Sequence, residues 1–357
     1  MPKTRVLIVD DSVVVRRLLA DCVASDPELE VVGTAPNGKI ALTKITHVNP
    51  DIVTLDIEMR EMDGLATLTA IRKTHPKLPV IVFSTSTERG RGAIVDALAL
   101  GANDCVTKPA NVESVTAAIQ RIRDDLVPKI KRLCCKAAET ISRPVVRNSA
   151  VIRCKSAIDV VAIGVSTGGP NALAEMLPML AANFPVPVLI VQHMPMLFTR
   201  PLADRISTLS TLRAREGEQG ARLRPGEAWV APGGFHMEVE QAEDCVRLRI
   251  HDAPRENSCR PAVDVLFRSV AKVFGDSALA VVLTGMGQDG LVGCRWIREA
   301  GGQVIVQDEA SSVVWGMPGA VSNAGLAEKV LPLRDIAEEI NQRVLAGNAS
   351  RPILKAS

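Results

Sequence analysis

The chain has 357 residues, of which 47% are hydrophobic and 23% charged, and its formal net charge is +2 at pH 7. This length accommodates two domains, and the small net charge excludes a general attraction to nucleic acid or to an acidic membrane. Apolar runs such as VPVLIV are far shorter than the roughly 18 residues of a membrane span. The N-terminus MPKTRVLIVDD reaches two aspartates where a signal peptide would continue its apolar core, so we expect a cytoplasmic protein.

The first 110 residues alternate short β-rich runs with helix-length amphipathic segments. Five such runs follow one another, namely RVLIVD, EVVGTA, DIVTLDI, PVIVFST and DCVTKP. Strands that alternate with helices predict a doubly wound, five-stranded parallel sheet of the flavodoxin-like type. Ligands bind such sheets at the carboxyl ends of the strands.

Charged and hydroxyl side chains stand at the ends of these predicted strands. Three carboxylates brought together repel one another unless a divalent cation or a raised pKa relieves the repulsion, and an all-oxygen site suits Mg²⁺. A lysine and a serine at the same edge would stabilise a phosphoryl group passing to a carboxylate. The residues concerned are Asp10, Asp11, Asp56, Ser84 and Lys108, with Asp56 as the natural nucleophile.

A second βα alternation begins at Asp159, after a segment with two prolines and weak apolar periodicity. We therefore expect a first domain over 1–124, a linker over 125–157 and a second domain over 158–350. VVAIGVS, VPVLIVQHM, SALAVVLTGMG and GQVIVQD are the expected strands of a mainly parallel second sheet. Residues 212 to 252 indicate antiparallel hairpins instead.

The turn GVSTGGP follows the first strand of the second domain and matches G-x-S-x-G around Ser166. His193 and Asp289 follow two later strands, so parallel pairing would bring all three side chains to one edge. A histidine activates a serine hydroxyl by taking its proton, and an aspartate orients the histidine. Each residue also has a structural interpretation: Ser166 in an ordinary turn, His193 closing a strand, and Asp289 as a helix N-cap. His236 is a rival base.

Glycine-flanked turns near these residues favour an oxyanion hole, which requires backbone amides aimed at developing negative charge. We assign this role to the amides of Thr167 and Met286.

The first 120 residues resemble the receiver domain of two-component response regulators, on the motifs VLIVDDS, DIVTLDIEMREMDG and VTKP. The resemblance implies that Asp56 is phosphorylated, that Asp10 and Asp11 hold Mg²⁺ with it, and that Ser84 and Lys108 read the phosphoryl group. It also implies a cis bond between Lys108 and Pro109. Many receivers carry an aromatic switch residue three positions before the lysine.

The chain has Cys105 at that switch position, which puts an aromatic switch in doubt. Eight cysteines are scattered without any C-x-x-C pair, so the sequence indicates neither a zinc site nor a disulfide framework. They stand at positions 22, 105, 134, 135, 154, 245, 259 and 294.

The second domain resembles the catalytic domain of the chemotaxis protein-glutamate methylesterase on IGVSTGGP, VQHMP, APGG, RPAVDVLF and LTGMGQDG. The resemblance implies hydrolysis of glutamate methyl esters and deamidation of selected glutamines on the cytoplasmic domains of chemoreceptors, through a glutamyl-serine intermediate. Ser166, His193 and Asp289 would form the triad, without a cofactor for hydrolysis. A histidine kinase would supply the phosphoryl group, and phosphorylation would relieve inhibition by the receiver. We expect a monomer that binds no nucleic acid and is not inserted in the membrane.

Two alternatives remain open at this point. Residues 121–147, at the end of the first domain and in the linker, carry eight cations, which would suit a DNA-binding output, although this segment has no aromatic residue and no recognisable helix-turn-helix. The cations are Arg121, Arg123, Lys129, Lys131, Arg132, Lys136, Arg143 and Arg147. The glycine-rich turns at 164–170 and 284–290 would suit a nucleotide-binding output, which leaves His193 unexplained.

Overall fold

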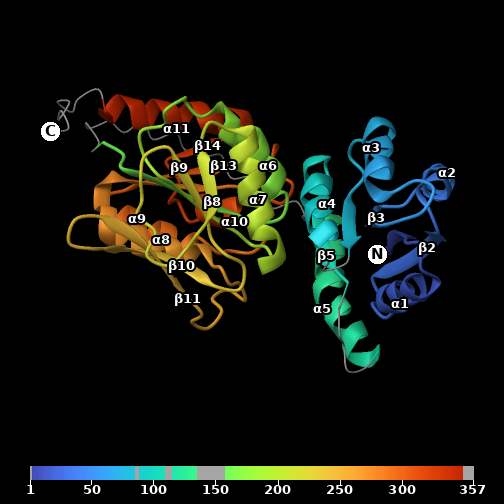
Figure 1. The fold of residues 1–357 in the computed structure, drawn as a ribbon. Coiled ribbons are helices and arrows are strands. Elements are labelled where there is room, and N and C mark those ends of the chain that lie inside the picture. Colours follow the sequence, from blue (N-terminus) through green and yellow to red (C-terminus); the bar gives the residue numbers. More distant parts are fainter. Residues whose placement is uncertain (1, 85–87, 109–114, 135–156, 349–357) are drawn as a thin grey trace. The chain divides into compact units, whose positions relative to one another are not determined.

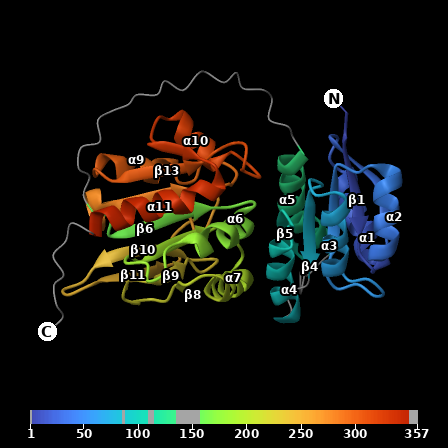
Figure 2. The ribbon, with the colours of Figure 1, turned by 90° about the horizontal axis from the view of Figure 1, so that it is seen from above.

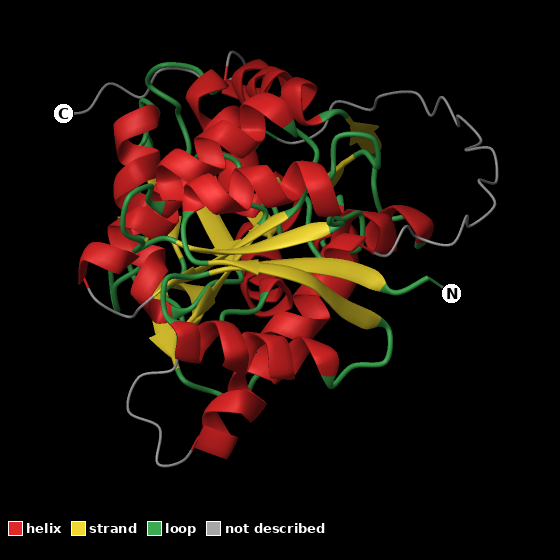
Figure 3. Ribbon diagram, turned by 90° about the vertical axis from the view of Figure 1, so that its right-hand side faces the viewer, coloured by secondary structure: helices red, strands yellow, loops and turns green. Residues whose placement is uncertain are grey.

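The computed structural model describes residues 2–84, 88–108, 115–134 and 157–348. The chain divides into two compact units, Met1–Thr140 and Ile141–Ser357. Figure 1 shows the elements of the first unit in blue to teal and those of the second in green to red. Figure 3 shows strands with helices on either side of them.

The first unit is built on a five-stranded parallel sheet with the strand order β2-β1-β3-β4-β5. Strands β1, β3 and β4 lie at its centre and are buried, as expected when helices cover both faces. The strands are β1 Thr4–Val9, β2 Leu29–Ala35, β3 Ile52–Asp56, β4 Val80–Ser84 and β5 Asp104–Thr107. The expected flavodoxin-like sheet is therefore confirmed.

Short polar side chains cap the N-termini of three of the five helices of this unit. Ser12 Oγ accepts a hydrogen bond from Val15 N, Asn37 Oδ1 from Ile40 N, and Asp63 Oδ1 from Ala66 N. Such caps satisfy backbone donors that a helix leaves without an internal partner. The helices are α1 Val13–Ala24, α2 Gly38–Val48, α3 Gly64–Thr74, α4 Glu88–Ala99 and α5 Val115–Cys134.

Helix α5 extends to Cys134, ten residues into the segment where we expected a linker from residue 125. The helix continues because Leu126 and Ile130 are fully buried in the core of the first unit. Three cations from the segment also form ion pairs with acids of this unit, and only residues 135–156 of the expected linker lie outside the described residues. The pairs are Lys129 with Asp104 and Asp125, Lys131 with Asp26 and Glu28, and Arg132 with Asp104.

The second unit contains a seven-stranded sheet in the order β14-β13-β12-β6-β7-β9-β8, with every pair parallel. Figure 2 labels β13, β6, β9 and β8 of this sheet. Strands β12, β6 and β7 are central, and all their residues are buried. The strands of this sheet are β6 Val160–Val165, β7 Val188–Gln192, β8 Arg213–Glu216, β9 Glu227–Val230, β12 Ala278–Val282, β13 Gln303–Gln307 and β14 Lys329–Leu331.

Residues 212 to 252 are only partly antiparallel, which corrects our expectation of hairpins throughout. Strands β10 (His236–Gln241) and β11 (Val246–His251) form the expected hairpin. Strands β8 and β9 instead extend the parallel sheet beside β7. All four residues of β9 are buried, a pattern typical of strands covered on both faces.

Helices pack on both faces of this sheet. Helix α8 contacts α9, the β10 strand and β6, while α6 contacts α7 and α11. The helices are α6 Gly169–Met176, α7 Met196–Leu209, α8 Val263–Phe274, α9 Leu291–Glu299, α10 Met317–Asn323 and α11 Leu333–Asn348, with 3₁₀ turns at η1 Leu177–Met179 and η2 Gly275–Ser277. Within the described part of the chain, none of the helices has the length and apolar character needed to cross a membrane.

Candidate active site and phosphorylation site

Three neighbouring strands of the second unit end at one edge of the sheet, and a polar residue follows each. Ser166 comes directly after β6 and His193 directly after β7. Asp289 lies in the loop between β12 and α9. Because β6 pairs in parallel with both β7 and β12, the three loops leave the sheet on the same side. The sequence prediction that these residues share an edge is therefore confirmed by the topology.

Two glycines shape the turn that carries Ser166. Gly168 has φ +79°, a backbone conformation that residues with a Cβ rarely adopt. At Gly164 a Cβ would lie 2.4 Å from Val263 Cγ1, so only glycine allows the start of helix α8 to approach β6 this closely. Ser166 N also donates to Thr284 O at 3.0 Å. The turn is thus held by the loop after β12, which also leads to Asp289.

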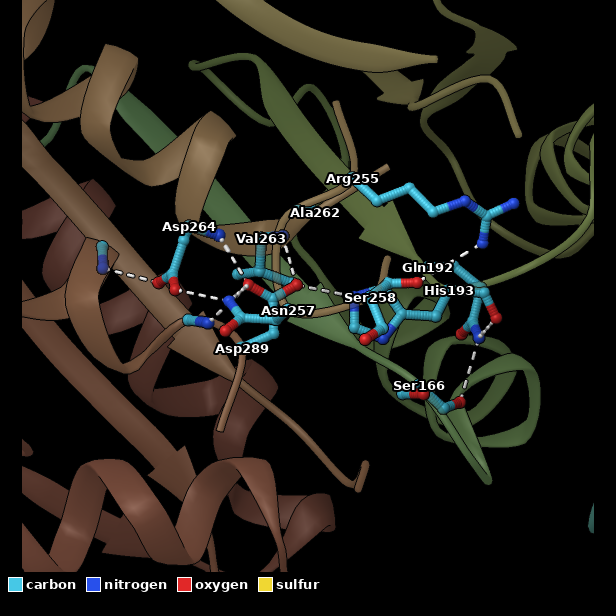
Figure 4. A network of polar contacts seen from close by, with 12 residues as sticks. Ser166, Gln192, His193, Arg255, Asn257, Ser258, Ala262, Val263, Asp264 and Asp289 are labelled. Carbon is cyan, nitrogen blue, oxygen red and sulfur yellow. Dashed lines mark hydrogen bonds and ion pairs between the residues drawn. The ribbon is translucent and has the colours of Figure 1, made fainter. Parts of the chain in front are cut away.

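Gln192, which sequence reasoning missed, joins the serine turn to the histidine. Its side chain is buried, and Nε2 donates to Ser166 O at 3.0 Å and to His193 O at 3.1 Å (Figure 4). An amide that bonds both backbones fixes the distance between the two loops. The signal in the sequence was a polar residue ending an otherwise apolar buried strand.

Asp289 is the best-bonded side chain of the site. Its Oδ2 lies 2.7 Å from His193 Nε2, and the carboxylate is 2% exposed. Four further hydrogen bonds hold it: Oδ2 accepts from Val263 N at 2.7 Å, while Oδ1 accepts from Asp264 N, Gly290 N and Asn257 Nδ2 at 2.9–3.0 Å. Asp289 therefore caps helix α8 rather than the helix that follows it in sequence.

Asn257 is a second residue that sequence reasoning missed. Its Nδ2 donates to Asp289 Oδ1 at 2.9 Å and to Asp264 Oδ2 at 2.8 Å, and Figure 4 shows the amide between the two carboxylates. Burial raises the pKa of Asp264, and the nearby charge of Asp289 adds to this rise. The Asn257 amide offsets the repulsion between the two buried acids, since it donates to both.

The surroundings of His193 favour its protonated form, the imidazolium that would arise during catalysis. Burial alone would lower the pKa of its imidazole, but the hydrogen bonds and charges of Asp289 and Cys259 outweigh burial and raise the pKa to about 9. The structure records no hydrogen bond between the Ser166 hydroxyl and His193 among the described residues. Catalytic hydrogen bonds are often long or misaligned in free enzymes and tighten when substrate binds.

His236, the rival base, is occupied by structural contacts. Its Nε2 lies 3.0 Å from Pro254 O, and Ala262 N donates to its Nδ1 at 3.3 Å. The side chain is 1% exposed, and burial lowers its pKa. His236 thus supports the segment leading into α8.

Thr167 and Met286, the expected oxyanion residues, lie on two different loops, the serine turn itself and the loop after β12. Thr167 follows Ser166 and is buried, while Met286 is half exposed. Gly285, which precedes Met286, packs so closely on the serine that a Cβ would lie 2.8 Å from Ser166 Cβ.

The first unit brings its predicted site residues together at the carboxyl edge of its sheet. One oxygen from each of Asp10, Asp11 and Asp56 lies within 4.8 Å of the other two. Lys108 Nζ is 2.8 Å from Asp10 Oδ2 and 2.7 Å from Asp56 Oδ2. Ser84 Oγ is buried and has no hydrogen-bond partner among the described residues. An all-oxygen donor set with a lysine and an unpaired hydroxyl fits Mg²⁺ and a phosphoryl group.

Two further expectations for this unit concern the Lys108–Pro109 bond and the switch position at Cys105. The bond between Lys108 and Pro109 lies outside the described residues, because Pro109 does. Cys105, at the position of the aromatic switch, is buried, and its carbonyl accepts from Lys129 Nζ at 2.5 Å. Helix α5 thus binds the strand directly at this position.

The fold and the two sites define a response regulator. Its first unit is a receiver with an acidic edge, and its second α/β unit has a serine, a histidine and an aspartate on one edge. Comparisons with known proteins agree with this class. Residues 6–120 match the response regulator receiver domain, and residues 161–340 match CheB methylesterase. The chain therefore belongs to the CheB methylesterase family.

Relatives and a solved structure support this membership. A protein-glutamate methylesterase/protein-glutamine glutaminase of Trichodesmium erythraeum is 52% identical over 96% of this chain and 100% of its own length. One of the same name from a Nocardioides species is 49% identical, with 96% of each chain covered. The crystal structure of the Thermotoga maritima CheB methylesterase catalytic domain matches with a TM-score of 0.51 at 39% identity, covering 52% of this chain and 98% of that one. The DNA-binding and nucleotide-binding alternatives are not favoured.

Proposed function

We propose that Ser166, His193 and Asp289 carry out the protein-glutamate methylesterase and protein-glutamine glutaminase activity of this chain. The observation that carries this proposal is the 2.7 Å contact between His193 Nε2 and Asp289 Oδ2 beside the serine turn. The domain boundaries that we propose for the activity are a receiver that continues to the end of helix α5 at Cys134 and a catalytic domain over 158–350. The substrates are glutamate methyl esters and glutamines of chemoreceptors.

The reaction begins when His193 takes the hydroxyl proton of Ser166 and the serine oxygen attacks the glutamyl carbonyl. The negative charge of Asp289 stabilises the imidazolium that forms. Collapse of the tetrahedral intermediate expels methanol, or ammonia from a glutamine, with the proton returned by His193. Water then hydrolyses the glutamyl-serine ester by the same proton transfers, and glutamate leaves.

The backbone amides of Thr167 and Met286 are the proposed donors to the oxyanion. Support comes from their position on the two loops that hold Ser166, one following it and the other packed against it. These steps need no metal or cofactor, so chelation of divalent cations is expected to leave basal hydrolysis unchanged.

Phosphorylation is the function of a receiver domain, and it usually depends on Mg²⁺. We propose Asp56 as the phosphorylated residue, with Asp10, Asp11 and Asp56 holding Mg²⁺. Lys108 and Ser84 would contact the phosphoryl oxygens, which agrees with the lysine contacts to Asp10 and Asp56 and the unpaired Ser84 hydroxyl. A chemotaxis histidine kinase is the phosphodonor.

We further propose a cytoplasmic monomer that neither binds nucleic acid nor inserts into membranes, since its substrate glutamates belong to the cytoplasmic domains of receptors. Three cations that suggested DNA binding are paired with acids of the receiver, which weakens that alternative. A gel shift at physiological salt tests this point.

Methanol release from methylated receptor membranes tests the catalytic assignment. Ser166→Ala should lose activity on the order of 10⁴-fold or more, as expected for a triad nucleophile. An active Ser166→Ala protein would show that the serine is a turn residue only. His236→Gln serves as a control for the rival base and should retain hydrolysis if it stays folded.

A further inference from the structure

Cys259 lies beside the proposed catalytic residues but takes no part in the hydrolysis described above. One ligand atom from each of His193, Cys259 and Asp289 lies within 4.8 Å of the other two. His193 and Cys259 are partly exposed, and Asp289 is buried. The group therefore has a nitrogen, a sulfur and an oxygen donor at one place that solvent reaches.

The backbone around Cys259 is held in one conformation. Glu256 and Cys259 exchange two backbone hydrogen bonds, of 3.1 Å and 2.8 Å, across a turn. Asn257 and Ser258 at its centre have φ of 51° and 63°, the pattern of a type I′ hairpin turn. Arg268 binds both carboxylate oxygens of Glu256 at 2.5 Å and 2.6 Å. The thiol thus lies near His193 on a turn that is closed by its own backbone and held to helix α8 through Glu256 and Arg268.

The other two donors are also held in place. Backbone amides at the start of helix α8 orient Asp289, and the histidine imidazole is bonded to that carboxylate. Little reorganisation is then needed, because tetrahedral zinc with bonds of about 2.0–2.3 Å places its ligand atoms roughly 3.3–3.8 Å apart. Closing the group by about 1 Å reaches this range.

The donor types select the metal. Mg²⁺ and Ca²⁺ prefer oxygen ligands alone, whereas a thiolate with an imidazole and a carboxylate suits Zn²⁺. Three protein ligands also leave a fourth position for water, as in zinc sites that stay open to solvent.

We propose that His193, Cys259 and Asp289 bind Zn²⁺, and that zinc bound there inhibits the hydrolase. The thiol proton leaves to solvent as the zinc–sulfur bond forms. The proton that His193 Nε2 holds toward Asp289 is replaced by zinc, and the imidazole keeps its single proton on Nδ1, taken from solvent, while the Nε2 lone pair binds the metal. His193 can then no longer accept the serine proton. The inhibition rests on the proposed role of His193 in hydrolysis, whereas the binding does not.

Direct zinc binding tests the site without reference to activity. The full chain is titrated with Zn²⁺ against a chromophoric chelator, with Mg²⁺ in excess to fill the acidic edge of the receiver. Cys259→Ser should bind zinc at this site on the order of 10–100-fold more weakly than wild type. Cys245→Ser, which changes a partly exposed cysteine in the loop between β10 and β11, is the matched control and should bind like wild type.

Methanol release under the same conditions tests inhibition. Zinc should inhibit wild type and Cys245→Ser, and a chelator should restore both. Each protein is compared with its own zinc-free activity. The zinc concentration that halves the activity of Cys259→Ser should be at least about tenfold higher than the concentration that halves the activity of wild type. The same comparison is made with Cys259→Ala, because alanine has no hydroxyl that could replace the thiol as a zinc ligand. Circular dichroism verifies that this variant is folded.

Equal zinc affinity of wild type and both Cys259 variants would overturn the site. Weaker binding by those variants with unchanged inhibition would overturn the inhibitory role. Failure of the proposed hydrolysis is distinguishable from either result, because it would appear as absent methanol release before any zinc is added.

Discussion

Asp289 Oδ2 accepts a hydrogen bond from the backbone nitrogen of Val263 at 2.7 Å, the same distance at which it lies from His193 Nε2. One oxygen therefore both closes the N-terminus of helix α8 and orients the proposed base. The helix dipole favours a negative charge at this position, which helps keep Asp289 ionised although it is buried. Its pKa is lowered: burial opposes this, but the hydrogen bond and charge of His193 outweigh burial.

Asp289→Asn is expected to impair both catalysis and stability. An amide no longer stabilises the imidazolium, so activity should fall on the order of 10⁴-fold. The loss of a charged cap should lower the free energy of unfolding by about 1 kcal/mol. Methanol release and thermal melting measure the two effects. Ser166→Ala is the control, since it should lose activity alone, and a catalytically normal Asp289→Asn protein would refute the orienting role.

Asn257→Gly should lower kcat by about tenfold to a hundredfold, because Asp289 and Asp264 each lose a charge-assisted hydrogen bond. Glycine is the informative substitution here: it tolerates the φ of 51° at this position, whereas alanine would add backbone strain. Steady-state kinetics on methylated receptors should show an unchanged KM. A rise in KM at constant kcat would mean that Asn257 contacts substrate instead.

Gly164→Ala is expected to destabilise the second unit by about 1–3 kcal/mol, because the new Cβ would lie 2.4 Å from Val263 Cγ1. Urea unfolding measures the change. Val263→Ala removes the clashing methyl groups, so the double variant should recover part of the stability relative to Gly164→Ala. Strictly additive effects of the two substitutions would show that the clash is not the cause.

Asp56→Asn should abolish both Mg²⁺-dependent phosphorylation by a small-molecule phosphodonor and any stimulation of methanol release by that donor. The reason is that the amide is neither a nucleophile for phosphorus nor an anionic ligand for magnesium. Ser166→Ala is the reciprocal control: it should incorporate phosphate normally while releasing no methanol. Stimulation that persists in Asp56→Asn would assign phosphorylation to another residue.

Much of the architecture follows from local sequence pattern alone. Apolar runs of strand length alternating with amphipathic segments predicted both parallel sheets, since each run must be buried on both faces. The same rule placed Ser166 and His193 correctly, because each directly follows a central strand. The predictions of where helix α5 ends and of how β8 and β9 pair were wrong. Distant segments bury Leu126, Ile130 and β9, and a local sequence pattern does not report such burial.

Only the tertiary structure decided how these residues are supported and what else they meet. The sequence predicted Asp289 to share an edge with His193, but not that it caps α8. Nor did any spacing indicate that Asn257 bridges two carboxylates, that Gln192 links two loops, or that Cys259 lies beside His193. The physical reason is that periodicity reports which face a residue buries within its own element, whereas these contacts join loops whose relative positions depend on the packing of the whole sheet.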